Sequence, residues 1–249
     1  MIPKSHPRYK SLLSRDKIVN AYKSGILADS GMIAHGRGEA FDYLIGEKTT
    51  ETAEKAIEAA AAALILAKNP IISVNGNTTA LVPQHVVKLA EVLGAKIEIN
   101  LFYRTPQRVE TIWKFLKDHG AGEILGTEEE EFKHIEGLDS PRGNVSPEGM
   151  YNADVILVSL EDGDRTEALV NSGKFVIAVD LNPLSRTAKT ASLTIVDNIT
   201  RAMPCIIDKV IKLKDKDPDE LKNLADNFNN INNLKESLKI MLNSINEFE

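Results

Sequence analysis

The sequence predicts an α/β protein with a Rossmann-like, mostly parallel sheet and helices on both faces of that sheet. Two observations support this prediction. Short apolar runs recur along the chain, and the run 175–179 lacks the polar alternation of a half-exposed strand, so both faces of this strand must be covered. Stretches with helical patterns separate the runs, as they do in βαβ units. N-terminal helices and a C-terminal helix complete the expected fold.

The segment before the sheet, residues 1–68, is expected to be helical. One helix should start at Ser14 and end at Gly25, a natural residue to follow a helix. The polar, glycine-containing stretch 28–39 follows and is expected to form a loop. An alanine-rich helix then runs from Thr50 until Asn69-Pro70 stops it.

Strands and helices should alternate in the sheet-containing core, residues 69–214. The expected strands are 71–74, 96–101, 154–160, 175–179 and 193–196, and the expected helices are 79–93, 107–118 and 165–171. A polar region, 120–150, lies between the second of these helices and the third strand. The last helix of the core should start near Pro204, because proline is tolerated in the first turn of a helix.

The C-terminal segment, residues 217–247, is expected to be one helix. Asp217-Pro-Asp-Glu220 combines an N-cap, a proline at the first helical position and an early acidic residue. Apolar residues follow at spacings of three and four and form one stripe: Leu221, Leu224, Phe228, Ile231, Leu234, Leu238, Met241 and Ile245. We favour packing of this stripe on its own domain, with a dimer-forming helix as the alternative. No repeat or linker divides the chain, so 1–249 is expected to be a single domain.

Composition excludes several classes of protein. A net charge of −6 and a pI near 5.5 argue against a nucleic-acid-binding protein, which needs clustered Lys and Arg. Cys205 is the only cysteine, so no internal disulfide can form, which suits a reducing cytoplasm. The N-terminus lacks the apolar core of a signal peptide, and the longest apolar run, 59–67, is too short to span a membrane. We therefore expect a cytoplasmic protein without membrane association.

Several common motifs are missing from the sequence. It has no Gly-x-x-x-x-Gly-Lys-Ser/Thr phosphate loop, and neither 36–38 nor 120–122 completes a dinucleotide-binding glycine motif. A nicotinamide-dependent oxidoreductase is therefore disfavoured. The five histidines show no metal-ligand spacing, so no metal site is predicted.

Polar residues at the carboxyl ends of predicted strands form the candidate site. Ligands of parallel sheets bind at this edge, where Asp180, Asn182, Arg186, Thr187 and Asn198 follow two strands. Carboxylate, amide, guanidinium and hydroxyl groups at one edge are typical of a nucleotide site.

The turn at 75–79 and four arginines are further candidates for ligand binding at this edge of the sheet. The turn at 75–79 occupies the position of a phosphate-binding loop, although Asn-Gly is also an ordinary turn, and both interpretations stay open. Arg15, Arg37, Arg104 and Arg186 fall at element ends or in glycine-containing loops. Together they suggest a ligand with several phosphates, since a guanidinium binds phosphate in a two-pronged geometry.

Several long motifs occur in an order that resembles a known family. They are Ile2-Pro-Lys-Ser-His-Pro-Arg-Tyr-Lys-Ser-Leu12, Ser14–Ile18, Ala34–Gly46, Val74–Ala80, Asp180–Thr187 and Asp197–Arg201. The chain is similar over most of its length to archaeal phosphopantothenate synthetase, the 4-phosphopantoate–β-alanine ligase family. The resemblance implies a homodimeric, cytoplasmic enzyme of coenzyme A biosynthesis. It implies that ATP, with Mg²⁺, drives the condensation of 4-phosphopantoate and β-alanine through a phosphopantoyl adenylate, with release of AMP and diphosphate.

The resemblance also implies the positions that contact ATP. They are Arg15, Arg37, Asp180, Leu181, Asn182, Arg186, Thr187, Asn198 and Ile199. Position in the predicted fold, not the resemblance, suggests the residues for 4-phosphopantoate and β-alanine: Asn75, Asn77, Thr78, Tyr103, Arg104, His134 and Arg142. No residue is assigned as the base for β-alanine. The alternative function is a regulatory protein that binds a nucleotide without catalysis.

Overall fold

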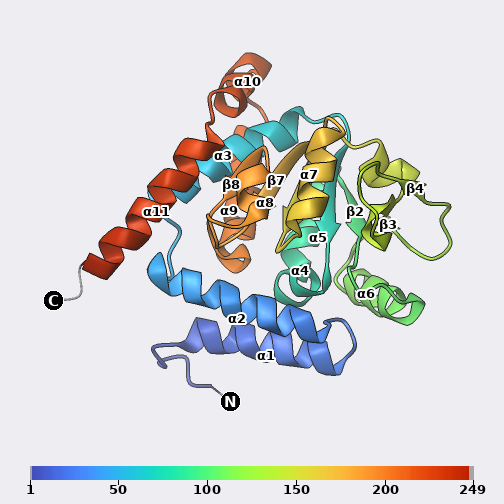
Figure 1. The fold of residues 1–249 in the computed structure, drawn as a ribbon, viewed down its shortest axis with the longest axis horizontal. Helices are drawn as coiled ribbons and strands as arrows, with labels where there is room; N and C mark the ends of the chain where they lie inside the picture. The colour runs from blue at the N-terminus through green and yellow to red at the C-terminus, as the bar shows by residue number, and fades with distance from the viewer. Residues whose placement is uncertain (1, 247–249) are drawn as a thin grey trace.

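The computed structural model describes residues 2–246 and has a six-stranded parallel sheet at its centre (Figure 1). The strand order is β3-β2-β1-β6-β7-β8. The strands are β1 (Pro70–Val74), β2 (Lys96–Ile99), β3 (Ile124–Leu125), β6 (Val155–Ser159), β7 (Phe175–Val179) and β8 (Leu193–Ile195). A separate antiparallel pair consists of β4 (Lys133–His134) and β5 (Asn144–Val145). The predicted α/β fold with a parallel sheet is confirmed.

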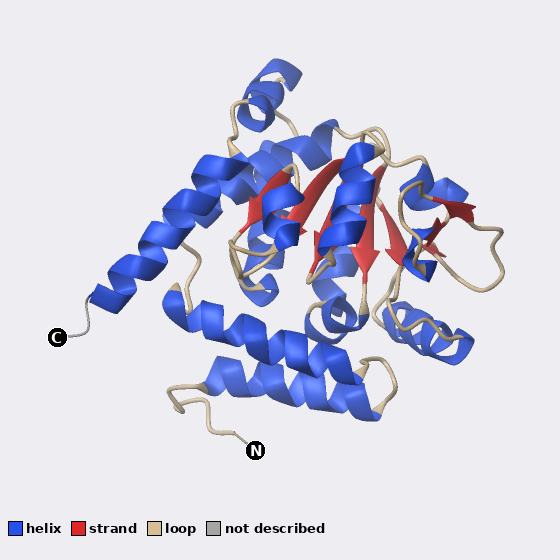
Figure 2. Ribbon diagram, viewed as in Figure 1, coloured by secondary structure: helices blue, strands red, loops and turns tan. Residues whose placement is uncertain are grey.

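Helices surround the sheet (Figure 2). They are α1 (Tyr9–Lys23), α2 (Asp29–Leu44), α3 (Glu51–Leu66), α4 (Gly76–Leu81), α5 (Pro83–Leu93), α6 (Pro106–Asp118), α7 (Gly163–Asn171), α8 (Arg186–Thr190), α9 (Ile199–Leu213), α10 (Pro218–Asp226) and α11 (Asn230–Asn246). Within residues 2–246, no helix combines the length and apolar character that crossing a membrane requires.

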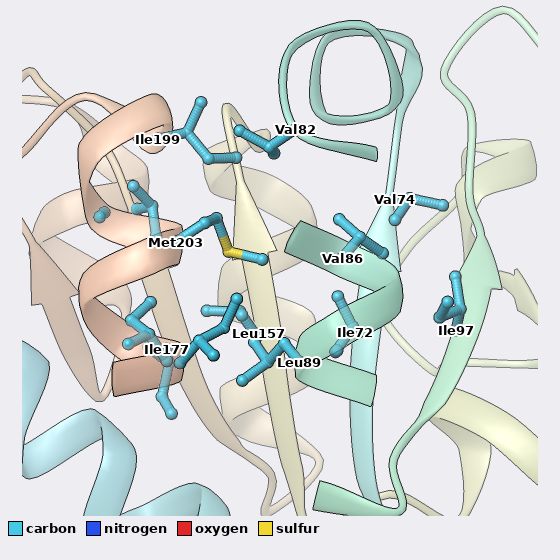
Figure 3. Packing of buried hydrophobic residues seen from close by; sticks show 14 of the residues in the cluster. Ile72, Val74, Val82, Val86, Leu89, Ile97, Leu157, Ile177, Ile199 and Met203 are labelled. Carbon is cyan, nitrogen blue, oxygen red and sulfur yellow. The ribbon is translucent and has the colours of Figure 1, made fainter. Parts of the chain in front are cut away.

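The strands are buried on both faces because successive side chains enter two different cores. Ile72 of β1 belongs to the larger core, which α3, α5 and α9 cover, whereas Ile71 belongs to a smaller core under α7. Figure 3 shows Met203 of α9 and Leu89 of α5 packed beside Leu157 of β6. This double coverage explains why the strands read as continuous apolar runs.

The chain path creates a crevice at the carboxyl edge of the sheet. From β1 the chain moves outward through β2 and β3, then returns to place β6 on the other side of β1. Ligands of open parallel sheets bind at such a reversal of strand order. The strand arrows in Figure 2 point toward α2, which lies beside α1 across this edge. The crevice is therefore closed on one side by a helical pair from the N-terminus.

Two predictions about the N-terminal half were wrong. The glycine-containing stretch 28–39 is not a loop but forms most of α2. Gly31 serves close packing, because a Cβ at this position would lie 2.8 Å from Oδ1 of Asn77. The single helix predicted at 79–93 is divided into α4 and α5 at Val82, since the following Pro83 disfavours helical geometry in the residue before it.

The helix predicted to start near Pro204 begins earlier. The side chain of Asn198 caps α9 by accepting a hydrogen bond from the amide of Thr200, and Pro204 lies inside the helix. A favourable cap and the packing of the apolar face of α9 on the sheet outweigh the hydrogen bond that proline removes.

The C-terminal segment 217–247 forms two helices within the described residues, not one, and residue 247 lies outside them. The break between α10 and α11 brings Asn230 and Asn233 to β8, the edge strand of the sheet. Oδ1 of Asn230 accepts from the amide of Thr194 at 2.8 Å, and Nδ2 of Asn233 donates to the Thr194 carbonyl at 2.8 Å. Two side chains thus satisfy an exposed strand edge as a neighbouring strand would.

Most of the apolar stripe of this segment packs against the rest of the chain. Leu221, Leu224 and Phe228 pack on the larger core, and Leu234, Leu238 and Met241 form a smaller one. Ile231 and Ile245 are exposed. The favoured interpretation, packing on the same chain, is confirmed for most of the stripe.

Other boundaries differ by smaller amounts. α1 begins at Tyr9, five residues before the predicted start at Ser14, and β2 ends at Ile99. The polar region 120–150 contains β3, the β4–β5 pair, a 3₁₀ turn at Pro141–Gly143 and a π-helical turn at Pro147–Tyr151. None of these differences moves a strand end away from the crevice.

Candidate functional site

A cavity of about 520 Å³ lies along the carboxyl edge of the sheet. Residues that follow four adjacent strands line its floor: Asn75 after β1, Leu101 after β2, Glu161 after β6 and Asp180 after β7. Residues of α2, including Arg37, line the opposite side. The cavity therefore crosses the point where the strand order reverses, as expected for the binding site of such a sheet.

A second cavity of about 450 Å³ adjoins the first. The two share Gly38, Leu160 and Leu181 in their linings. Asn198 and Ile199 line the second cavity, together with residues of the N-terminal segment. Asn198 and Ile199, two of the predicted ATP positions, thus lie beside a space that adjoins the first cavity.

The turn after β7 gives one end of the first cavity a fixed shape. Asp180 accepts a hydrogen bond from the amide of Asn182 at 2.9 Å and one from the hydroxyl of Ser185 at 2.5 Å. Burial raises the pKa of Asp180 more than these two hydrogen bonds lower it. Thr187 is buried, and its hydroxyl donates to the Glu161 carbonyl at 2.6 Å. Hydrogen bonds within this loop fix its shape, and through them Asp180 positions Asn182 beside the cavity.

Arg186 lies at the mouth of this end. Its guanidinium forms ion pairs with Asp164 and Glu167 of α7, and 59% of its side chain is exposed. The aliphatic stem crosses the start of α7 over Gly163, where a Cβ would meet Cβ of Arg186 at 2.6 Å. Gly163 thus lets Arg186 lie across the start of α7, where an incoming anion can compete with the two carboxylates.

Arg37 and Arg15 are placed differently. Arg37 lies within α2, is exposed and lines the first cavity, and its charge lowers the pKa of Asp180. Arg15 of α1 lines neither of these cavities, and its guanidinium pairs with Glu39 at 2.8 Å. Glu39 lines the second cavity. Arg15 lies on a helix as expected, but within α1 rather than near its start, and Arg37 lies within α2 rather than in a loop.

A buried ion-pair network holds Asn198 in place. Nδ2 of Asn198 donates to Asp42 of α2 at 2.8 Å. Arg201 bridges the same Asp42 and Asp197, with Nη2 at 2.5 Å and 2.6 Å from their oxygens. Burial raises the pKa of Asp197 more than Arg201 and Thr49 lower it. The network ties α2 to the start of α9 and fixes the wall between them.

Most side-chain polar groups of the turn at 75–78 form hydrogen bonds within the protein. Oδ1 of Asn75 accepts from the amide of Thr78 at 3.0 Å, and its Nδ2 donates to the Ser159 carbonyl at 2.8 Å across the strand reversal. Nδ2 of Asn77 donates to the carbonyl of Gly31 in α2 at 2.9 Å. Thr78 is buried. Asn75 and Asn77 still line the cavity, whereas Thr78 does not.

Of the four other predicted substrate residues, Arg142 lines the first cavity, and three are spread over a wider area. Tyr103 is exposed and lines the first cavity. Arg104 is not among the lining residues, and its guanidinium binds the Gly126 carbonyl and Glu128. His134 lies on β4, away from the lining residues, with Nδ1 at 3.0 Å from Oδ1 of Asn144. Of these three, only Tyr103 is brought to the cavity.

Comparison with known proteins identifies the family of this chain. The sequence pattern of the phosphopantothenate/pantothenate synthetase family matches residues 52–244. The chain belongs to this family. A 4-phosphopantoate–β-alanine ligase of Thermococcus kodakarensis is 54% identical over 238 residues, which cover 95% of this chain and 90% of that protein. Ligases of the same name from Methanosarcina mazei and Methanospirillum hungatei are 52% and 49% identical, over 95% and 90% of this chain and 92% and 90% of those proteins.

A chain of buried charges runs from Arg165 of α7 through Glu161 to Arg142 at the first cavity. Oε1 of Glu161 lies 2.6 Å from Nη1 of Arg142, and its Oε2 binds Arg165. The side chains of Arg142, Glu161 and Arg165 are 5%, 2% and 1% exposed. Burial raises the pKa of Glu161, but the two arginines outweigh this and lower it. The carboxylate is therefore ionised and holds Arg142 at the cavity.

Sequence analysis missed Glu161, Asp162 and Arg108 as lining residues. The first two directly follow the strand predicted at 154–160, so the rule applied to Asp180 would have found them. The hydroxyl of Thr105 caps the start of α6 by accepting a hydrogen bond from the amide of Arg108. Thr105 before Pro106 is a typical start of a helix, and this signal could have located Arg108 in the first turn of a helix that begins at the carboxyl edge of the sheet.

Glu98 of β2 gives the synthetase a pH-dependent stability. It is fully buried, and its two oxygens accept from the amides of Ser146 and Met150. Burial raises its pKa from 4.5 to about 7, despite these hydrogen bonds and the nearby Arg165. Between these pH values the folded chain keeps a proton that the unfolded chain has lost, so stability falls as the pH rises.

We expect this effect to appear as a difference between the wild type and Glu98→Gln, which cannot titrate. From pH 4.5 to 7 the wild-type free energy of unfolding should fall, relative to the variant, by on the order of 3 kcal/mol. Urea unfolding at several pH values measures it. Parallel pH profiles for the two proteins would show that Glu98 is ionised throughout.

Proposed function

We propose that this protein is an ATP-dependent ligase that joins 4-phosphopantoate to β-alanine and forms 4'-phosphopantothenate, AMP and diphosphate. The observation that carries the proposal is the 54% identity, over 95% of the chain, to a protein named 4-phosphopantoate–β-alanine ligase. The cavity supports it, because polar and cationic residues meet there at the carboxyl ends of four strands. The comparisons give no support to a regulatory protein without catalysis.

In the first half-reaction, an oxygen of the 4-phosphopantoate carboxylate attacks the α-phosphorus of ATP. The new P–O bond gives the phosphopantoyl adenylate, and the bond to the β-phosphate breaks, so diphosphate leaves. Two anions must approach each other, and the leaving group gains negative charge. Arg37 and Arg186 supply positive charge at the Asp180 end of the cavity, which lowers both barriers.

In the second half-reaction, the neutral amine of β-alanine attacks the acyl carbon of the adenylate. The C–N bond forms, the bond to AMP breaks, and the amine loses a proton. This step depends chiefly on positioning and on a deprotonated amine. Asn182, Asn198 and Ile199 are proposed to hold the nucleotide while it acts first as reactant and then as leaving group.

The proposed Mg²⁺ enters with ATP. Within residues 2–246, no group of three or more His, Cys, Asp or Glu side chains is placed to hold a metal ion by itself. Mg²⁺ at nucleotide sites is held mainly by substrate phosphates, water and one or two carboxylates, and the carboxylate of Asp162 beside the cavity fits this role. Bound there, the ion would reduce the negative charge of the phosphates.

Exchange of labelled diphosphate into ATP tests the proposal, because adenylate formation is reversible. We expect exchange that requires 4-phosphopantoate and does not require β-alanine. ATP binding without exchange would support the regulatory alternative. Addition of β-alanine should then produce AMP and 4'-phosphopantothenate in equal amounts.

A homodimer located in the cytoplasm belongs to the same proposal. Ile231, Leu242 and Ile245 of α11 are more than half exposed, which supports burial of apolar surface in an assembly. Light scattering coupled to size-exclusion chromatography would measure the mass, and a monomer at working concentrations would contradict the dimer.

A further inference from the structure

Arg108 differs from Arg142 and Arg186, which also line the first cavity, and from the exposed Arg37 on the opposite wall. Arg142 and Arg186 each form ion pairs with two carboxylates. Arg108 is half-buried, yet within residues 2–246 no carboxylate oxygen lies within 4.0 Å of its guanidinium. Burial lowers its pKa, but a guanidinium stays charged at neutral pH. A positive charge is thus partly removed from water without a counter-charge, which costs free energy unless an anion binds there.

Backbone contacts aim this guanidinium at the cavity. Nε of Arg108 donates to the Ile26 carbonyl at 3.1 Å, and Nη1 donates to the Tyr103 carbonyl at 2.7 Å. Nη2 lies against the turn after β1, where a Cβ on Gly76 would approach it to 2.9 Å. A larger residue at position 76 would therefore push into the guanidinium. Nη2, beside Gly76 in the cavity lining, is the nitrogen that can still bind a ligand.

We infer that Arg108 binds the phosphate of 4-phosphopantoate and makes the synthetase specific for the phosphorylated acid. The inference rests on the proposed function and assigns one end of its acid substrate. The carboxylate of that substrate must reach the nucleotide at the Asp180 end of the cavity. Its phosphate is at the other end of the molecule, and Arg108 lies at the other end of the cavity, beyond the ends of β1 and β2.

The lining between these ends suits the rest of the acid. The buried side chains of Leu27 and Leu101 and the exposed ring of Phe102 line the cavity near Arg108. 4-Phosphopantoate carries two methyl groups on the carbon next to its phosphate-bearing carbon. An apolar wall beside a cationic residue therefore matches the order of groups along this substrate.

Selectivity between 4-phosphopantoate and unphosphorylated pantoate tests the inference. For Arg108→Gln we expect the affinity for 4-phosphopantoate, measured by titration calorimetry, to fall about 10- to 100-fold, the usual effect of losing a hydrogen bond to a charged group. The affinity for pantoate and the KM for ATP should change less than twofold. Arg108→Lys should bind 4-phosphopantoate with an affinity between those of the wild type and Arg108→Gln, since lysine keeps the positive charge but lacks the guanidinium nitrogens that bond the Ile26 and Tyr103 carbonyls.

Lys114→Gln is the matched control, because it removes one positive charge from the same helix at an exposed ion pair with Glu110. Equal weakening of both acids by Arg108→Gln would overturn the inference and assign Arg108 a structural role through Ile26 and Tyr103. A raised KM for ATP alone would overturn it in favour of a nucleotide contact. Arg108-dependent binding of 4-phosphopantoate without diphosphate exchange would keep the subsite and reject the proposed function.

Discussion

Replacement of Glu161 by glutamine should lower the free energy of unfolding by about 3–5 kcal/mol. The side chain is 2% exposed and neutralises Arg142 and Arg165, which are themselves buried. Glutamine keeps the size of the side chain but removes its charge and one acceptor. Asp162 remains beside Arg142, whereas Arg165 loses its ion-pair partner and stays inside the protein. Removing one member of a buried network is costly because the remaining charge has no counter-charge.

Urea unfolding at pH 7 measures this loss. Glu167→Gln, on the helix α7 that follows Glu161, is the control, since its ion pair with Arg186 is exposed and should contribute no more than about 1 kcal/mol. If Glu161→Gln destabilised the protein as little as Glu167→Gln, Arg165 would have to reach water or another anion. That result would show that the charge chain is not essential to the fold.

The strands could be predicted because the sheet is covered on both faces. Continuous apolar runs and their separation by helices located β1, β2, β6, β7 and β8 to within two residues. The helices were harder to predict where local signals conflict with tertiary packing. Glycines indicated a loop at 28–39, yet α2 uses Gly31 to approach Asn77. Long-range contacts of this kind leave no periodic pattern in the sequence.

The site could be predicted in part for the same reason. Polar residues after a strand must meet at one edge of a parallel sheet, so Asp180, Asn182 and Asn75 were located from the sequence. The partner of each side chain could not be predicted. Asn75 is engaged in capping α4 and bridging to β6, and Arg104 in binding Glu128. Arg108, which has no carboxylate partner within the described chain, was recognised only once burial and contacts were known.

Arg186→Ala should lower kcat/KM for ATP by about 100- to 1000-fold, the effect of removing one group that stabilises developing charge. The same change should lower the free energy of unfolding by no more than about 1 kcal/mol, because its ion pairs with Asp164 and Glu167 are exposed to solvent. The guanidinium of Arg186 is paired with these two carboxylates, so the phosphates of ATP must displace the carboxylates in order to bind it. Arg186 can therefore contribute much to the reaction and little to the fold.

Initial rates of diphosphate exchange at several ATP concentrations, together with thermal unfolding, separate these two effects. Lys189→Ala is the matched control, since it removes one exposed positive charge from the same short helix outside the first cavity. Its kinetics and melting temperature should both stay near wild type. An Arg186→Ala protein that unfolds early but keeps its ATP dependence would contradict the proposal. Arg186 would then brace α7 against α8, and the charge that assists departure of diphosphate would have to come from Arg37, the exposed arginine on the opposite wall of the cavity.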